Sequence, residues 1–264
     1  MESNTLRFRK NNYSNDESDG KISVHLLSVI ENMNLKYLKD TIYWEAFSTL
    51  LVANFKLYEQ LNLTKHPNDY YLHSMPTFYN LCFTTENNEY MWSEYGDSGN
   101  GISIGFSKSL LKRFLDYPDD ENKNKYLFCT CGKVIYDDET KFEILTDLII
   151  NAYGEYCIKY PTDKVSDLWE KLLSDLLLCS FFFKDEQKWN KENEFRFILL
   201  HTRNLTTPSI DDSGNPYIDF NFNKSINLRK AAIKNIFYKN EAYIELLSKY
   251  EVNSFFIERI KNTK

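Results

Sequence analysis

The sequence predicts an α+β protein in which a mixed, split β-sheet is flanked by helices. Residues 40–61, 141–159 and 166–183 place apolar side chains at steps of three and four, which is typical of amphipathic helices. Shorter runs, such as 77–84 and 192–200, carry the apolar and aromatic side chains favoured in strands. No period repeats along the chain, so we expect a single mixed domain rather than an array of repeats.

The first half of the chain alternates strands with helices. Strands are predicted at 5–9, 77–84, 101–106 and 126–136, the last as a strand or a hairpin. The stripe of the helix at 40–61 consists of Trp44, Phe47, Leu51, Phe55, Tyr58 and Leu61. Short helices are predicted at 89–95, with Gly96 as a stop signal, and at 110–115. Polar loops are expected at 11–20, 67–76 and 118–125, the last of them exposed.

The second half begins with the two longer helices and ends with strands. After the strand at 192–200, residues 211–216 give a strong turn signal. Further strands are predicted at 219–222, 231–238 and 254–260, and one more helix at 241–250. We find no convincing linker, so one domain is predicted over residues 1–264.

Composition and charge restrict the functional classes. The chain has 264 residues, 42% of them apolar, which is ample for a packed core. Its net charge of −6 gives no electrostatic reason to bind nucleic acid. No apolar run reaches the roughly 18 residues of a membrane span, and the polar N-terminus lacks a signal-peptide core. We therefore expect a cytoplasmic protein, with a protein partner or a homo-oligomer left open.

Cysteine and histidine positions give no sign of a metal site. The five cysteines are Cys82, Cys129, Cys131, Cys157 and Cys179. Cys129-x-Cys131 has no second Cys or His pair at zinc spacing, and the four histidines are scattered. We expect reduced, buried thiols and no metal.

The strand at 192–200 carries the first candidate site. Because side chains alternate along a strand, Glu192, Glu194 and Arg196 should share one edge. The opposite, core-facing positions are Phe195, Phe197 and Leu199. A carboxylate on a rigid strand can stabilise an oxocarbenium ion or hold a ribose hydroxyl, and a nearby Arg can orient it or bind phosphate. The alternative is a structural ion pair at the end of a strand.

Two aromatic residues and a glycine-rich segment form further candidates. Trp92 and Tyr95, three residues apart on the helix at 89–95, should present both rings on one face, where they could stack on a nicotinamide or an adenine. Core packing is the alternative. The segment Gly96-x-x-Gly99-x-Gly101 follows a helix and enters a strand, the reverse of a dinucleotide-binding loop, so a tight turn is the better interpretation.

Taken together, these motifs resemble a large bacterial family known as domain of unknown function 2971. The shared segments are Leu81–Thr84, Met91–Gly96, Gly101–Phe106, Lys184–Arg196, Ile233–Ile236 and Val252–Ile260. The resemblance covers residues 77–264, and residues 1–76 diverge.

The family in turn resembles the ADP-ribosyltransferase superfamily, whose split mixed sheet cradles NAD. The resemblance implies that Glu194 stabilises the ribosyl cation and that Glu192 orients or activates the acceptor. Trp92, Tyr95 and Arg196, singled out above from their own chemistry, are the candidate NAD contacts beside these carboxylates. This step is an analogy at the level of the fold.

The N-terminal part departs from the family pattern. Residues 6–9 followed by 15–16 look like the family's second strand and turn, with Glu17 where Pro is usual. Either the first strand is missing with its nicotinamide-site residue, or Arg7 or Arg9 is that residue on a remodelled strand.

The resemblance implies an NAD-dependent ADP-ribosyltransferase or NAD-cleaving enzyme, acting on an unknown acceptor as an intracellular toxin or phage-defence effector. A second hypothesis is an inactive nucleotide- or protein-binding module of the same fold. A third is a glycoside hydrolase using the paired carboxylates, which a single strand edge serves poorly.

Overall fold

The computed structural model describes residues 5–10, 23–34, 42–63, 77–97, 100–118, 120, 122–159, 165–201, 205–221, 233–238 and 257–259. Contacts within the chain divide it into two compact units, and the chain passes between them four times. Unit 1 comprises Met1–Arg9, Phe78–Gly132 and Lys191–Lys264, and unit 2 comprises Lys10–Thr77 and Lys133–Asn190. The division into two compact units does not test whether they form one domain, so the single domain over residues 1–264 stays a prediction.

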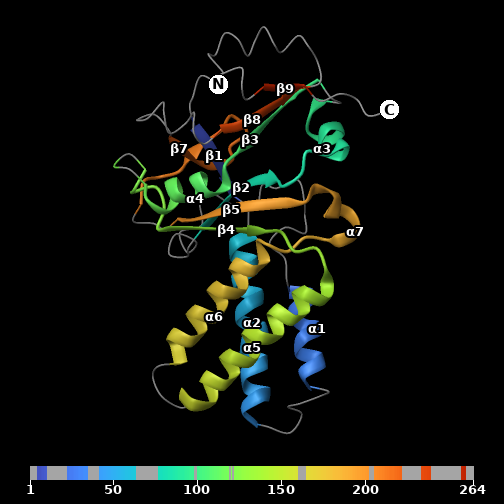
Figure 1. Ribbon diagram of the computed structural model, residues 1–264. Helices are drawn as coiled ribbons and strands as arrows, with labels where there is room; N and C mark the ends of the chain where they lie inside the picture. Colours follow the sequence, from blue (N-terminus) through green and yellow to red (C-terminus); the bar gives the residue numbers. More distant parts are fainter. Residues whose placement is uncertain are drawn as a thin grey trace. The chain divides into compact units, whose positions relative to one another are not determined.

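Unit 2 is helical (Figure 1). Its helices are α1 (Ser23–Met33), α2 (Ile42–Leu63), α5 (Asp138–Lys159), α6 (Val165–Ser180) and the short α7 (Glu186–Trp189). The four longer helices pack around one apolar core. Its fully buried members include Val29, Phe47, Leu51, Phe55, Leu145, Ile149 and Leu176. Two excursions of the chain, far apart in sequence, therefore build one helical unit.

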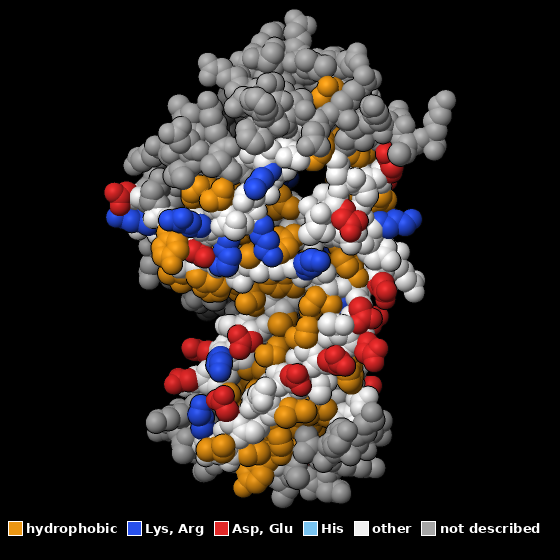
Figure 2. All heavy atoms as spheres, in the orientation of Figure 1, with side chains coloured by type: hydrophobic (Ala, Val, Ile, Leu, Met, Phe, Trp, Pro, Cys, Tyr) orange, Lys and Arg blue, Asp and Glu red, His pale blue; other side chains and the backbone are white. Residues whose placement is uncertain are grey.

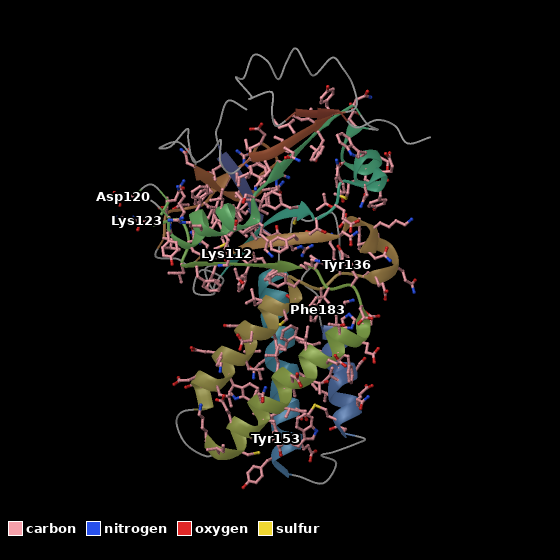
Figure 3. All side chains as sticks on the ribbon, viewed as in Figure 1. Lys112, Asp120, Lys123, Tyr136, Tyr153 and Phe183 are labelled. Carbon is pink, nitrogen blue, oxygen red and sulfur yellow. The ribbon has the colours of Figure 1, made fainter. Side chains whose placement is uncertain are left out.

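Aromatic rings fill the centre of that core. The ring of Trp44 meets Tyr153, labelled in Figure 3, edge-on at 5.2 Å, and Phe47 stacks on Trp169 at the same centroid distance. The stripe predicted on α2 is confirmed at Trp44, Phe47, Leu51 and Phe55. Its members Tyr58 and Leu61 lie outside the described side chains.

Unit 1 carries two β-sheets (Figure 1). The six-stranded sheet has the order β4-β5-β2-β1-β7-β6. Its strands are β1 (Thr5–Lys10), β2 (Thr77–Thr84), β4 (Phe128–Lys133), β5 (Glu194–His201), β6 (Ser209–Ile210) and β7 (Pro216–Asn221). The three-stranded sheet consists of β3 (Ile102–Phe106), β8 (Ile233–Tyr238) and β9 (Ile257–Arg259), in that order. β1–β7, β6–β7 and β3–β8 pair antiparallel and β8–β9 pair parallel, so the mixed α/β architecture is confirmed.

One face of the six-stranded sheet packs on a second apolar core. Phe195, Phe197 and Leu199 of β5 lie in it, as the strand alternation predicts. Helix α4 (Lys108–Asp116) contributes Leu111 and Leu115 to the same cluster. The side chains on the opposite face of β5 are Glu194, Arg196 and Ile198, and these are buried as well. The strand that bears the candidate site is thus enclosed on both faces.

Helix α1 is the main element that the sequence reading missed. Its buried side chains Leu26, Val29, Ile30 and Met33 follow steps of three and four, so a periodic signal was present. The loop predicted as exposed at 118–125 contains a buried residue, Asn122. Its side chain exchanges two hydrogen bonds with the backbone of Asn221, which explains the burial of a polar group. The segments 11–20 and 67–76 and the helix predicted at 241–250 lie outside the described residues.

The expectation of buried thiols is wrong for two cysteines. Cys82 and Cys157 are exposed, Cys157 because the buried stripe of α5 ends on Tyr156, a quarter turn away. Burial raises the pKa of the Cys129 thiol to about 12 and that of Cys179 to about 11, so these two thiols stay protonated. Among the described residues, no helix is both long and apolar enough to span a bilayer.

Candidate functional site

The candidate carboxylates straddle the beginning of β5. Glu192 closes a short 3-10 turn, Asn190–Glu192, and the strand starts only at Glu194. Between them Asn193 has a φ of 44°, in the left-handed region, which interrupts the extended backbone. The prediction that both carboxylates occupy one strand edge is therefore wrong for Glu192. The side chains of Glu194 and Arg196 do project from the same side of the strand, as predicted.

The turn before β5 is fixed by the segment that follows β2. Every residue from Lys191 to Asn193 accepts or donates a hydrogen bond there. The bonds are Asn88 Nδ2 to Lys191 O (3.1 Å), Thr84 Oγ1 to Glu192 O (2.8 Å), Thr85 N to Asn193 O (2.8 Å), Thr85 Oγ1 to Asn193 O (3.0 Å) and Asn193 Nδ2 to Glu86 Oε2 (3.0 Å). Asn88 also caps α3 (Glu89–Glu94) by accepting from the backbone N–H of Met91. The position of Glu192 is thus determined by contacts about 100 residues away in sequence.

Tyr95 donates its hydroxyl hydrogen to Glu192. The Oη–Oε1 distance is 2.5 Å, although the tyrosine is 53% exposed and the glutamate 4%. A phenol that donates to a carboxylate forms a charge-assisted bond, stronger than one between neutral groups. The polar end of Tyr95 therefore reaches a buried carboxylate while its ring stays half in solvent.

Glu194 is paired with Arg196. Nε of Arg196 lies 2.6 Å from Oε1 and Nη2 lies 3.1 Å from Oε2, a bidentate arrangement. The exposed fractions are 5% for Glu194 and 0% for Arg196. Two charges removed from water in this way need each other, because either one alone carries a large desolvation cost. Both carboxylate oxygens of Glu194 are engaged by its own strand.

Trp92 and Tyr95 have different hydrogen-bond partners. Trp92 is buried, its indole Nε1 donates to Asn87 Oδ1 at 2.7 Å, and α3 ends at Glu94 so that Tyr95 is the C-cap. The two rings differ in environment, since Trp92 is buried whereas Tyr95 is half-exposed. The turn predicted at Gly96 is confirmed, with Gly101 N donating to Gly96 O at 2.7 Å.

Arg7 and Arg9 lie on β1, and strand β2 separates β1 from β5. Arg7 pairs with Asp219 of β7 at 3.0 Å and its guanidinium lies 3.7 Å over the ring of Tyr217. The hydrogen bond to Asp219 raises the pKa of Arg7 above its ordinary value, so it stays charged. Arg9 faces Tyr217 in the register of the β1–β7 pair and is exposed.

Surface charge in unit 1 gathers around α4, where Figure 2 shows several Lys and Arg side chains on one face. Part of this charge is neutralised locally. Lys112 pairs with Asp116 at 2.6 Å and Lys123 with Asp120 at 3.0 Å, all of them but Asp116 labelled in Figure 3. Within the described ranges, no three His, Cys, Asp or Glu side chains lie together as a metal site would require.

The described geometry thus brings four of the predicted site residues to the start of β5: Tyr95, Glu192, Glu194 and Arg196. Trp92 is the buried residue of α3. The sequence reading missed Thr84, Asn88 and Asn193. Of these, only Asn88 carried a local signal, as an Asn immediately before a helix.

Residues 91–197 match the model of a family described as protein of unknown function (DUF2971). This match supports the family resemblance, and the DUF2971 segment contains Trp92, Tyr95, Glu192, Glu194 and Arg196 but neither Arg7 nor Arg9. Comparisons with curated proteins and with solved structures give no match.

Proposed function

We propose that this chain cleaves the bond between nicotinamide and ribose in NAD and transfers ADP-ribose to an acceptor or to water. The observation that carries the proposal is the pair of buried carboxylates at the start of β5, each held by a donor of its own. Glu192 accepts from Tyr95, and Glu194 accepts from Arg196. Fixed carboxylates in a site of low exposure are what stabilisation of a developing cation requires.

The reaction uses the two groups in sequence. The bond between ribose C1′ and the nicotinamide nitrogen breaks, and its electron pair leaves with the nicotinamide. A carboxylate stabilises the positive charge that develops at C1′. The acceptor oxygen or nitrogen then bonds to C1′ and gives its proton to the second carboxylate, acting as general base.

The DUF2971 match covers the segment that holds these residues and carries no information on the chemistry. It spans the β5 carboxylates, Arg196, Trp92 and Tyr95. The reaction itself rests on the analogy with the ADP-ribosyltransferase superfamily and on the chemistry of carboxylates.

The test is incubation of the purified chain with NAD labelled in its adenylate phosphate, with and without cell lysate. We expect label on an acceptor or in free ADP-ribose for the wild-type chain, and strong loss in Glu192→Gln and Glu194→Gln. Glu143→Gln, an exposed glutamate of α5, serves as the matched control and should retain activity. Equal labelling by all four proteins, or by none, contradicts the proposal.

A second candidate function is nucleotide or protein binding without catalysis. The observation that favours it over NAD catalysis is that two residues expected to hold NAD are bonded within the protein: Trp92 donates to Asn87, and Arg7 pairs with Asp219. Titration calorimetry with NAD, ADP-ribose and ATP distinguishes the two functions. If a nucleotide binds with measurable heat and the protein leaves it intact, the result favours a binding module. If the protein turns over NAD, the binding-module hypothesis is wrong.

The cellular role follows from the first proposal. An enzyme that consumes NAD or modifies an essential acceptor would arrest growth, as a toxin or a phage-defence effector does. Induced expression in a bacterial host should then slow growth for the wild-type chain and not for Glu192→Gln. Growth arrest by both proteins at equal abundance would argue against a role for the carboxylate.

A further inference from the structure

Tyr95 occupies an unusual position for an exposed aromatic residue. About half of its surface meets solvent, yet its hydroxyl donates to the 4%-exposed Glu192 across 97 residues of sequence. An exposed tyrosine ordinarily directs its hydroxyl to water, because the ring is the part that gains from burial. The inward hydroxyl suggests that the polar end of Tyr95, and not its ring, has the functional role.

We propose that Tyr95 is a positioning residue that acts on Glu192 through its hydroxyl group. The hydroxyl restrains the rotation of the Glu192 carboxylate by donating to its Oε1. The catalytic meaning of this role rests on the proposed function. This positioning role takes the place of the ring-stacking role that the spacing of Tyr95 from Trp92 suggested.

The phenol stands on a rigid base. The backbone N–H of Tyr95 donates to Met91 O at 3.0 Å, closing the last turn of α3. The first turn of the same helix is capped by Asn88, whose side chain also binds Lys191 O. The helix that presents Tyr95 is therefore bonded directly to the turn that presents Glu192, so the donor and the acceptor belong to one connected network.

Glu192 is restrained from both ends. Its backbone carbonyl accepts from Thr84 Oγ1 at 2.8 Å, while its side-chain Oε1 accepts from Tyr95. A carboxylate fixed in this way needs little reorganisation when charge develops beside it, which is how positioned groups lower a barrier. At metal sites, removal of a partner that orients a ligand costs roughly 10- to 100-fold in activity, and we expect a loss of that order here.

Two substitutions at one position separate the hydroxyl from the ring. Tyr95→Phe removes the hydroxyl and keeps the ring, and Tyr95→Leu removes both. If the hydroxyl positions Glu192, both variants lose kcat by roughly 10- to 100-fold with KM nearly unchanged. Tyr117→Phe, at an 80%-exposed tyrosine of the same unit, is the control and should match the wild type. A normal Tyr95→Phe together with a Tyr95→Leu that raises KM overturns the proposal in favour of ring stacking.

A spectroscopic readout keeps this inference separate from the proposed function. With glutamate labelled by carbon-13 at the carboxyl carbon, the Glu192 signal is assigned by its disappearance in Glu192→Gln. Tyr95→Phe should move that signal, and Tyr117→Phe should leave it in place. If the Glu192 signal moves in Tyr95→Phe but the wild-type protein leaves NAD intact, the positioning role is supported and the proposed NAD chemistry is wrong. An unmoved signal in Tyr95→Phe overturns the positioning role whatever the activity.

Discussion

Arg196 donates to both carboxylate oxygens of Glu194, two residues earlier on the same strand, over 2.6 Å and 3.1 Å. Both side chains project from one face of β5, because alternate residues of a strand point the same way. The pair is almost fully removed from solvent. Its geometry makes Arg196 the group that orients Glu194, and the stability of unit 1 should depend on keeping both members.

Removing one member of this pair should be costly. Arg196→Met leaves the Glu194 carboxylate buried without its guanidinium, and we expect a loss of about 3–5 kcal/mol in the free energy of unfolding. The double variant Glu194→Leu with Arg196→Met should recover most of that loss, since no isolated charge remains. Urea denaturation followed by circular dichroism measures both. A single variant within about 0.5 kcal/mol of the wild type, the range of ordinary surface changes, would show that the pair is not structural.

Gly96 should tolerate no side chain. A Cβ there would lie 2.8 Å from both Cε3 and the backbone oxygen of Trp92, and the backbone oxygen cannot move away cheaply. We expect Gly96→Ala to destabilise by about 1–3 kcal/mol, as overpacking does. Gly154 of α5 has nothing within 4 Å, so Gly154→Ala should stabilise by about 0.5–1 kcal/mol through helix propensity. Opposite shifts in thermal midpoint check the pair of predictions.

Asn193 should accept glycine better than a β-branched residue. Its φ of 44° costs little for Asn or Gly but about 1–2 kcal/mol for most other side chains. Asn193→Gly loses the hydrogen bond to Glu86, whereas Asn193→Val loses the bond and adds the backbone strain. The order of stability in urea should be wild type, Gly, Val. If Val equals Gly, the left-handed conformation is not required in solution.

His25 makes unit 2 sensitive to mild acid. Burial, and then the Lys141 ammonium, lower its pKa below the ordinary value of 6.5, opposed by Asp138 and Asp185. The unfolded chain therefore binds more protons than the folded one between the lowered pKa and about 6.5. The stabilising contribution of neutral His25 is complete above that window and is lost as the pH falls through it.

The comparison that isolates this effect is wild type against His25→Gln. The difference in the free energy of unfolding, wild type minus His25→Gln, should shrink or reverse from pH 7.5 to pH 5. This range of ~2.5 pH units spans the titration of histidine. A difference that stays constant with pH would show that His25 titrates alike in both states. The subtraction removes the contribution of carboxylates such as Asp137, whose pKa the Thr140 hydrogen bonds lower in both proteins.

Local patterns predicted most of the strands and the longer helices, because each depends on short-range periodicity. The stripe of α2 and the core-facing side chains of β5 are examples. The sequence also indicated Glu192, Glu194 and Arg196 as candidate site residues, since charged side chains at the beginning of an apolar strand are unusual. Helix α1 carries the same kind of stripe in Leu26, Val29, Ile30 and Met33, so it too is predictable from local periodicity.

The site geometry depended on information that no local pattern contains. The left-handed Asn193 separates Glu192 from the strand, and the contacts that hold it come from residues 84–88, about 100 positions earlier. Tyr95 was assigned by its spacing from Trp92, but its hydroxyl donates to Glu192, 97 residues later in the sequence. Long-range pairing also builds unit 2 from two separate stretches of chain.

The most direct test of the central claim is release of nicotinamide from NAD labelled in the nicotinamide ring. The account predicts steady release by the wild-type chain and a strong reduction in Glu192→Gln and in Glu194→Gln, with both variants folded by circular dichroism. Absence of release by the wild-type chain, with and without acceptor lysate, would contradict it. Release by both carboxylate variants at the wild-type rate would contradict it as well.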